Sequence, residues 1–258
     1  MSRGSLTVVG TGIQIAAHLT PAAREAIESA DVVLAVVTDP VTLMLVEEIN
    51  PTTRSLHGLY EQGRDRRETY AAMTEEILRE VRDGKRVCAA FYGHPGVFVD
   101  PSHRAVTQAR AEGYRAELLP AISAEDCLLA ELGVDPAEDG CLSYEATDFL
   151  ARNREVVPTA GLVLWQVGTV GNAKGSAEAA VPGLPVLVEK LLDHYPADHE
   201  VVVYQASQFR SLESMIHRVP LGELGPQHVT AMSTLYVPPV ARAAEDPEMI
   251  ARLRFSVA

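Results

Sequence analysis

Hydrophobic residues in the first half of the chain gather in short runs that are separated by helical patterns. Apolar runs over residues 6–10, 31–37 and 86–91 are each followed by glycine, proline or aspartate, which is typical of buried strands. Between the first two runs, a Thr-Pro pair at the start of residues 20–28 supplies an N-cap and a first-turn proline for a helix. The order strand, helix, strand predicts a parallel sheet with helices on its faces.

The clearest helical pattern covers residues 64–82. Apolar side chains recur there at helical spacing, at Tyr70, Met73, Ile77, Leu78 and Val81. Gly84 follows as a stop signal. The first turn is unusual because it holds three arginines, which the helix dipole disfavours at this end. One of them, Arg66, lies four residues before Tyr70, so the two share a face of the helix.

The rest of the chain predicts a second series of elements. We expect helices over residues 100–112, 123–132 and 184–194, and strands over 114–119, 141–145, 162–167, 200–205 and 234–237. Ser123 and Asp126 form a near capping box, and the glycine-rich residues 168–176 predict a loop. Pro120 marks a boundary, so we expect two α/β domains, residues 1–119 and 120–258.

Composition and charge exclude several classes of partner. The 258 residues carry a formal net charge of −13, which argues against binding to nucleic acid or to an anionic membrane surface. The longest apolar run, residues 32–37, is far shorter than the ~20 residues of a membrane span. Three widely spaced cysteines predict neither a metal site nor a disulfide framework. No signal peptide is visible, so we expect a soluble, cytoplasmic protein.

Candidate chemistry concentrates in the turn between the run at residues 86–91 and the helix that opens at Asp100. Gly93, Pro95 and Gly96 allow bare backbone to approach a ligand. An aromatic, an imidazole and a guanidinium flank this turn, at Tyr92, His94 and Arg104. Because ligands bind at the carboxyl ends of strands in α/β proteins, this turn is either the floor of a binding site or an ordinary strand-to-helix connection.

Four segments, in the same order as in the family, carry a resemblance. They are Tyr92-Gly93-His94-Pro95-Gly96 with Pro101-Ser102-His103-Arg104, then the segment Leu119-Pro120-Ala121-Ile122-Ser123-Ala124-Glu125-Asp126-Cys127, then Trp165-Gln166-Val167-Gly168, and finally Ser233-Thr234-Leu235-Tyr236-Val237-Pro238-Pro239. Together they resemble the tetrapyrrole-methylase superfamily of S-adenosylmethionine (SAM) methyltransferases. Within it they are most similar to the borosin peptide-backbone α-N-methyltransferases. The resemblance implies two α/β domains of the class III SAM methyltransferase type, with SAM in the interdomain cleft and S-adenosylhomocysteine (SAH) as product.

The resemblance also implies which residues bind SAM. The pair Gly10 and Gly12 is too short for a dinucleotide fingerprint, because Ile15 stands in place of the third glycine, but it resembles the first glycine loop of this fold. The methionine and ribose side matches Gly93, His94, Pro95, Gly96, Val99, Ser123 and Ala124. The adenine side matches Gln166, Val167, Gly168, Ser233 and Thr234.

Four residues match the catalytic residues of borosin enzymes: Tyr60, Arg66, Tyr70 and Tyr92. An amide nitrogen is a poor nucleophile because its lone pair is delocalised, so it must lose its proton. A phenol has a pKa near ~10, and a neighbouring guanidinium favours its phenolate form. We therefore expect Tyr60 or Tyr70 to act as base, Arg66 to stabilise charge, and Tyr92 to position the substrate. The sequence leaves open which of the two phenols is the base.

The chain departs from the fused fungal borosin enzymes, which carry their substrate as a C-terminal extension. Here the chain stops at Ala258, shortly after the Pro-Pro pair at residues 238–239. We therefore expect the split type, in which a separate precursor peptide is methylated in trans by a homodimer, as a heterotetramer when each subunit binds a precursor. Two alternatives stay open, a precorrin-type tetrapyrrole C-methyltransferase and a SAM-binding subunit without turnover.

Overall fold

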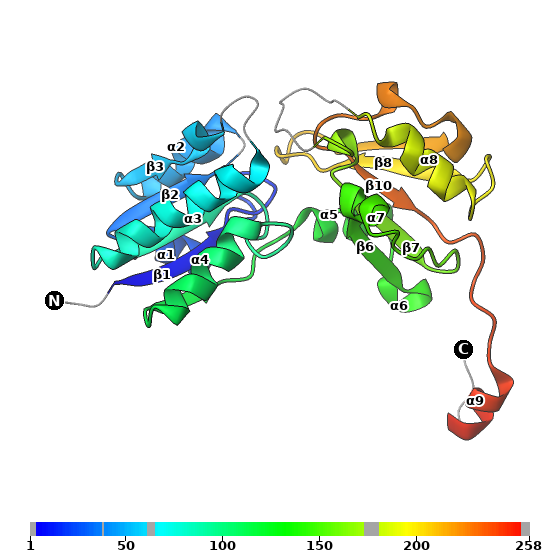
Figure 1. Ribbon diagram of the computed structural model, residues 1–258, viewed down its shortest axis with the longest axis horizontal. Helices are drawn as coiled ribbons and strands as arrows, with labels where there is room; N and C mark the ends of the chain where they lie inside the picture. Colours follow the sequence, from blue (N-terminus) through cyan, green and yellow to red (C-terminus); the bar gives the residue numbers. More distant parts are fainter. Residues whose placement is uncertain (1–3, 38, 61–64, 173–180, 254–258) are drawn as a thin grey trace. The chain divides into compact units, whose positions relative to one another are not determined.

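The computed structural model describes residues 4–37, 39–60, 65–172 and 181–253 (Figure 1). The chain forms two compact units. The first unit contains the described residues up to Val134 together with the segment Gln205–Met215. The second unit contains Asp135–Gly171, residues 181–204 and the described residues from Ile216 onward. Helix α5 (Ala124–Leu132) thus belongs to the first unit. As a division between functional domains, the expected boundary after Leu119 stays a prediction.

The first unit contains a parallel sheet in the order β3-β2-β4-β1-β5. Its strands are β1 (Ser5–Gly10), β2 (Val32–Val36), β3 (Thr53–Ser55), β4 (Arg86–Phe91) and β5 (Arg115–Leu118). In the register of β1 and β4, Gly10 lies opposite Phe91. The two glycine-containing turns therefore leave the sheet side by side at its carboxyl edge, as the sequence pattern predicts.

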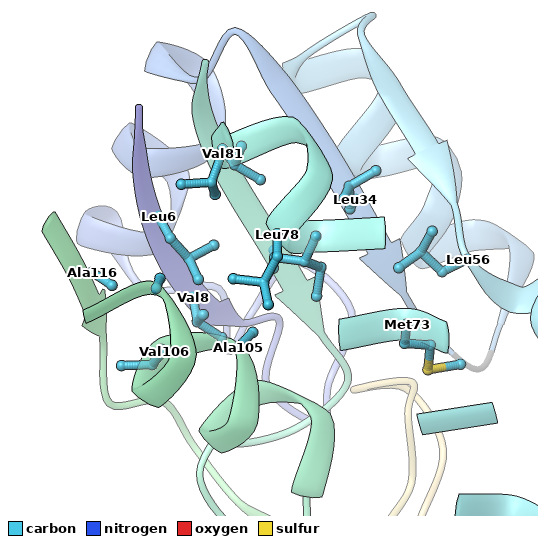
Figure 2. Close-up of a cluster of buried hydrophobic side chains, with 14 of the residues drawn as sticks. Leu6, Val8, Leu34, Leu56, Met73, Leu78, Val81, Ala105, Val106 and Ala116 are labelled. Carbon is cyan, nitrogen blue, oxygen red and sulfur yellow. The ribbon is translucent and has the colours of Figure 1, made fainter. Parts of the chain in front are cut away.

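Helices cover both faces of this sheet (Figure 1). They are α1 (Pro21–Ser29), α2 (Pro40–Ile49), α3 (Arg66–Arg82) and α4 (Asp100–Ala111), with a 3-10 turn η1 (His57–Leu59) before α3. Met73 of α3 and Ala105 of α4 pack with Leu6 and Val8 on one face, as Figure 2 shows. On the other face, Ile27 of α1 is buried together with neighbouring strand residues. Successive side chains of each strand point to opposite faces of the sheet, so the strands contribute residues to two separate hydrophobic cores.

Polar caps explain where the helices of the first unit begin. The side chain of Thr20 accepts a hydrogen bond from the amide of Ala23 at α1, and Ser123 and Asp126 form a complete capping box at α5. These findings confirm the predicted starts of both helices. Helix α2 was not predicted. Met44 is an apolar residue that is 65% exposed, so the apolar residues of this segment do not lie on one face of the helix.

The second unit contains a mixed sheet in the order β6-β7-β10-β8-β9. Its strands are β6 (Cys141–Glu145), β7 (Gly161–Trp165), β8 (Glu200–Gln205), β9 (Met215–Pro220) and β10 (Thr234–Val237). Strand β10 runs antiparallel to both β7 and β8, whereas β6 and β7 are parallel. The strand β9 was not predicted. Its charged, mostly exposed residues are typical of a sheet edge.

Helices and 3-10 turns complete the second unit. They are α6 (Pro136–Asp139), α7 (Ala146–Ala151), α8 (Leu184–Leu192), α9 (Pro247–Leu253), η2 (Val167–Thr169), η3 (Leu221–Glu223) and η4 (Pro226–His228). The strand expected over residues 162–167 ends at Trp165, because Gln166 has a left-handed φ of 58° and starts η2. Part of the loop expected over residues 168–176 lies outside the described residues.

The buried cysteines behave as small core residues. Cys88 lies in β4 and Cys127 in α5, and both are buried free thiols. Burial raises the pKa of the Cys88 thiol to about 12, so it stays protonated at neutral pH. Of the helices that the structure describes, none is both long enough and apolar enough to cross a membrane.

A buried carboxylate at the end of α3 gives a first testable prediction. Glu80 is 3% exposed and pairs with Arg54, Arg79 and Lys85, and these hydrogen bonds, that of Lys85 foremost, lower its pKa to about 2. Because the folded pKa is depressed, this stabilisation is present above pH 4.5 and is lost as the pH falls towards 2. We expect Glu80→Gln to lower the free energy of unfolding at pH 7 by about 2 kcal/mol. This value allows for solvent screening of the three cations, whose side chains are partly exposed.

Urea unfolding of wild type and Glu80→Gln at pH 7 and at pH 3 measures this effect. The difference in the free energy of unfolding between the two proteins should be smaller at pH 3 than at pH 7. The matched control is Glu112→Gln, because Glu112 also pairs with an arginine, Arg82, but at the surface. A gap that is independent of pH, or equal for the two substitutions, would contradict the argument.

Candidate active site

Two glycine turns are joined to each other at the carboxyl edge of the first sheet. The amide of Gly12 donates to the carbonyl of Gly93 at 3.2 Å, and the amide of Gly93 donates to the carbonyl of Gly12 at 3.0 Å. The amide of Thr11 also donates to the carbonyl of Phe91 at 2.8 Å. The turn after β1 and the turn after β4 therefore form one continuous backbone surface.

Steric conditions require glycine at three positions of this surface. A Cβ on Gly10 would lie 2.1 Å from the carbonyl oxygen of Gly93, which is far inside van der Waals contact. Gly12 and Gly93 have φ angles of +72° and +69°, which strain any residue with a side chain. A Cβ on Gly93 would meet only the end of Ile13, at 3.4 Å. Gly10 is therefore needed for internal packing, whereas Gly93 leaves open space beside the backbone.

The first turn of α4 fixes the rest of the second turn. The buried hydroxyl of Ser102 donates to the carbonyls of Pro95 and Val99, the latter at 2.7 Å. The ring of His103 lies 2.9 Å from the carbonyl of Gly96 through its Nε2. Nδ1 of His94 accepts a hydrogen bond of 2.9 Å from the amide of Gly96. These contacts hold the predicted residues His94, Pro95, Gly96 and Val99 in one rigid turn.

Ser123 and Ala124 stand where the chain enters α5. A Cβ on Gly10 would also lie 2.6 Å from the Cβ of Ala121, so the segment before Ser123 passes directly beside the first glycine turn. Ser123 is buried, and its hydroxyl lies 2.7 Å from the carboxylate of Asp126 in the capping box. The nine SAM residues predicted in the first half of the chain therefore all belong to the first unit.

Tyr92 leaves β4 at the same edge and is half-buried. Its amide donates to the carbonyl of Val36 at 3.0 Å, which ties it to the end of β2. Burial is the main cause that raises the pKa of the Tyr92 phenol, nearby Asp39 adds to the increase, and a hydrogen bond with Gln208 acts in the opposite direction. The phenol of Tyr92 is therefore protonated at neutral pH.

Gln208 is a site residue that the sequence did not reveal. It belongs to the segment Gln205–Met215, which comes from the distant end of the chain and joins the first unit. Its backbone carbonyl accepts a hydrogen bond of 2.9 Å from the amide of Ile15, just after the first glycine turn. The segment has no hydrophobic period or glycine motif, so no sequence signal marked it.

The other predicted catalytic residues lie on η1 and α3, which contact each other. Tyr60 directly follows η1, is 42% exposed, and has its ring centroid 5.6 Å from that of His57. Tyr70 is half-buried on α3 and packs against the core of the first unit. Arg66 is the first residue of α3, and its side chain lies outside the described residues. The carboxylate of Asp65 caps this helix and offsets the arginines in its first turn.

The five SAM residues predicted in the second half gather at adjacent ends of β7 and β10. The amide of Val167 donates to the carbonyl of Ser233 at 3.1 Å, and the hydroxyl of Ser233 accepts from the amide of Thr230 at 2.8 Å. A Cβ on Gly168 would lie 1.6 Å from the carbonyl oxygen of Thr230, so only glycine fits there. Gln166, with its left-handed backbone, and Thr234, which starts β10, complete the set.

The only tryptophan is a core residue. Trp165 is 7% exposed, and its indole N–H donates to the hydroxyl of Ser143 at 2.7 Å. The structure thus places the predicted residues in two groups, one in each unit. That these groups bind a cofactor and a substrate stays a prediction.

Residues 5–224 match the family model of tetrapyrrole (corrin/porphyrin) methylases. The chain is 44% identical, over 97% of its length, to a methyltransferase/ribosomally synthesized cyclic peptide omphalotin A precursor from Omphalotus olearius. It is 42% identical, over 98% of its length, to the corresponding dendrothelin A precursor from Dendrothele bispora. These matches cover 61% and 62% of the two relatives, so the chain spans about three fifths of their length.

Solved structures with a similar fold are more distant in sequence. The uroporphyrin-III-C-methyltransferase of Thermus thermophilus has a TM-score of 0.66 and 20% identity, and the match covers 99% of this chain and 98% of that one. A cobalt precorrin-4 methyltransferase has a TM-score of 0.65 and 16% identity, with 91% and 94% of the two chains covered. At such identities the likeness extends to the fold alone.

Proposed function

Because the chain belongs to the tetrapyrrole (corrin/porphyrin) methylase family, we propose that it uses SAM to methylate backbone amide nitrogens of a ribosomal precursor peptide. The predicted fold class, an α/β protein of the class III SAM methyltransferase type, is confirmed by this membership and by the two sheets. The observation that carries the peptide substrate is the 42–44% identity to proteins named as methyltransferase and cyclic peptide precursor in one chain.

The proposed substrate is a separate precursor that binds in trans. The relatives that match almost the whole of this chain are named both as methyltransferase and as cyclic peptide precursor, which supports a peptide substrate. We further propose that the enzyme works as a homodimer, and as a heterotetramer when each subunit holds a precursor. Light scattering of the isolated protein measures the first state, and an active monomer of 27.8 kDa would contradict it.

The residues of the first unit fit a ligand such as SAM. Small residues border the joined glycine turns, and of the residues that the structure describes, Ile13 alone beyond the chain neighbours comes within 4 Å of a Cβ built on Gly93. We propose that Gly10, Gly12, Gly93, His94, Pro95, Gly96, Val99, Ser123 and Ala124 hold the methionine and ribose part. Gln166, Val167, Gly168, Ser233 and Thr234 hold the adenine. When bound, SAM supplies a methyl group attached to a sulfonium, which is a strong electrophile.

Protein side chains then activate the amide. Tyr60 or Tyr70, as phenolate beside the guanidinium of Arg66, removes the amide proton. The deprotonated amide nitrogen would then take the methyl group that bound SAM supplies, with the neutral thioether SAH as the leaving group. Because the phenol of Tyr92 keeps its proton, its hydroxyl donates a hydrogen bond to the carbonyl oxygen, where negative charge develops.

The experiment that tests this function is co-expression of the chain with each small protein encoded beside it, followed by intact-mass and fragmentation mass spectrometry. We expect additions of whole methyl groups, located by fragmentation on backbone nitrogens. Methyl groups on side chains, or an unmodified peptide in the presence of SAM, would contradict the proposal.

The fold neighbours favour one alternative, a tetrapyrrole or precorrin C-methyltransferase. Incubation with uroporphyrinogen III and SAM, with absorbance spectra recorded after oxidation, tests it directly. A methylated tetrapyrrole would replace the peptide proposal with this one. Bound SAM that never becomes SAH with either substrate would instead favour a subunit without turnover.

A further inference from the structure

The exposed apolar side chains of the first unit gather at one edge of its sheet. Among its described residues, the large apolar side chains with an exposed fraction of 42% to 65% are Val41, Met44, Tyr60, Phe98, Phe209 and Leu212. The first four follow the carboxyl ends of β2, β3 and β4, in loops or in the first two turns of α2. The other two belong to the segment Gln205–Met215, whose Gln208 carbonyl accepts a hydrogen bond from the amide of Ile15 after β1. Exposed apolar side chains that gather at the ligand-binding edge of a parallel sheet indicate a docking surface.

Hydrogen bonds within residues 207–214 hold Phe209 and Leu212 at the surface. The amide of Ser207 donates to the hydroxyl of Ser214 at 2.9 Å, which joins the two ends of this loop. Within the loop, the hydroxyl of Ser207 donates to the carbonyl of Phe209 at 2.9 Å, and the amide of Leu212 donates to the same carbonyl at 3.0 Å. Polar contacts thus define the loop, while the side chain of Leu212 is 62% exposed. Its apolar surface is therefore available to a partner.

Phe98 combines a strained backbone with an exposed ring. Its φ of 54° lies in the left-handed region, which disfavours side chains other than those of asparagine and aspartate. The hydroxyl of Ser102 donates to the carbonyls of Pro95 and Val99, on either side of Phe98, so the turn enforces this conformation. The ring is nevertheless 44% exposed. A strained residue whose side chain lies largely outside the core points to a role in function.

The turn that holds Phe98 lies beside a residue that we assign to methyl transfer, Tyr70. The hydroxyl of Thr74 on α3 donates to the carbonyl of Tyr70 at 2.9 Å and lies 3.5 Å from the carbonyl of Pro101 in the first turn of α4. Val99 and Tyr70 also pack against the same hydrophobic core. The helical turn of Tyr70 and the residues directly after Phe98 are therefore neighbours in space.

We propose that Phe98, Phe209 and Leu212 form an apolar docking surface for the precursor peptide and bind its large apolar side chains beside the amide that is methylated. An extended peptide places alternate side chains on one side, so a row of apolar side chains can lie on this surface. The charged groups of SAM need polar partners instead, so we assign the surface to the peptide. This assignment rests on the proposed function, and it adds that the enzyme selects precursor segments with apolar side chains at alternating positions.

Substitutions on the docking surface should raise the KM for the precursor without slowing the chemical step. Asparagine accepts a left-handed backbone, so Phe98→Asn should not lower the melting temperature, whereas the KM for the precursor should rise roughly tenfold or more. The double variant Phe209→Ser with Leu212→Ser should show a similar rise, while kcat and the KM for SAM change less than about twofold. Phe98→Leu keeps an apolar surface and should retain most of the affinity for the precursor.

The matched control is Val186→Ser, because Val186 on α8 is 53% exposed but belongs to the second unit. It should leave the kinetic constants and the melting temperature unchanged. A precursor KM that is unchanged in Phe98→Asn and in the double serine variant would overturn the proposal. A change of oligomeric state in these variants, measured by light scattering, would also overturn it, because the surface would then belong to a contact between two copies of the chain.

A binding measurement separates this proposal from the proposed function. Its probe is a fluorescein-labelled peptide of alternating valine and serine, compared with an all-serine peptide of the same length by fluorescence anisotropy in the presence of SAH. We expect wild type and Val186→Ser to bind the valine peptide more tightly by roughly tenfold or more, and Phe98→Asn to lose this preference. If the preference is present but no precursor is methylated, the proposed function fails and the docking surface stands. Equal binding of the two peptides to wild type would overturn the docking surface, and methylation of a precursor would then still support the proposed function.

Discussion

Arg66→Lys should lower the rate of peptide methylation by roughly 10²–10⁴-fold and leave SAM affinity nearly unchanged. The reason is geometric, because lysine keeps the charge but loses the planar guanidinium that can contact a phenolate and a developing oxyanion together. Arg66 begins α3, and Tyr70 follows one turn later on the same face. Tyr60→Phe and Tyr70→Phe should both slow methylation, and the variant with the larger loss identifies the base.

Mass spectrometry of the precursor at fixed times gives these rates, and calorimetry gives the SAM affinity. Arg67→Lys controls for the charge at the helix start, since Arg67 is exposed and points to a different side of α3. Tyr114→Phe controls for packing, because Tyr114 borders the same core as Tyr70. Wild-type rates in Arg66→Lys and in both phenylalanine variants would show that the catalytic assignment is wrong.

A methyl group added to the second glycine turn should abolish SAM binding. In Gly93→Ala, the new Cβ enters the open space beside the joined turns and meets only the end of Ile13, so the protein should still fold. The left-handed φ of +69° costs about 1–2 kcal/mol of stability with any side chain. We expect a modest fall in melting temperature and at least a hundredfold loss of SAM affinity by calorimetry.

Two comparison variants make this result specific. Gly10→Ala should unfold or severely destabilise the protein, because its Cβ meets the carbonyl oxygen of Gly93 at 2.1 Å. Gly58→Ala should alter neither melting temperature nor SAM affinity, because no described residue beyond its chain neighbours has an atom within 4 Å of the new Cβ. A folded Gly93→Ala variant with wild-type SAM affinity would show that the cofactor does not approach this turn.

The sequence predicts four of the five strands of the first sheet because one physical signal controls them, whereas the short and mostly exposed edge strand β3 was not predicted. Parallel strands are buried on both faces, so they appear as apolar runs such as residues 86–91, and turns must follow each run. The second sheet is harder to predict, because an antiparallel strand such as β10 takes its place only through distant pairing with β7 and β8. The exposed edge strand β9 carries polar residues such as His217 and Arg218 and has no apolar run to detect.

The candidate site likewise contains some residues that the sequence could reveal and others that it could not. Gly93 is required by a left-handed turn, and the capping box at Ser123 is required by a helix start. Both requirements concern neighbouring residues, so they can be recognised in the local sequence. Gln208 comes from a distant part of the chain and accepts the hydrogen bond from the amide of Ile15 beside the first glycine turn, and its own sequence surroundings give no sign of that position.

The segment Gln205–Met215 limits how this protein can be taken apart. A fragment that ends at Val134 contains every strand of the parallel sheet but lacks Gln208, so Ile15 and Tyr92 each lose a hydrogen-bond partner. Recombinant dissection at that point would therefore give a protein with an incomplete surface around Tyr92. A linker fusing residues 205–215 to such a fragment, or the same residues supplied as a synthetic peptide, is the minimal addition for studying the first unit in isolation.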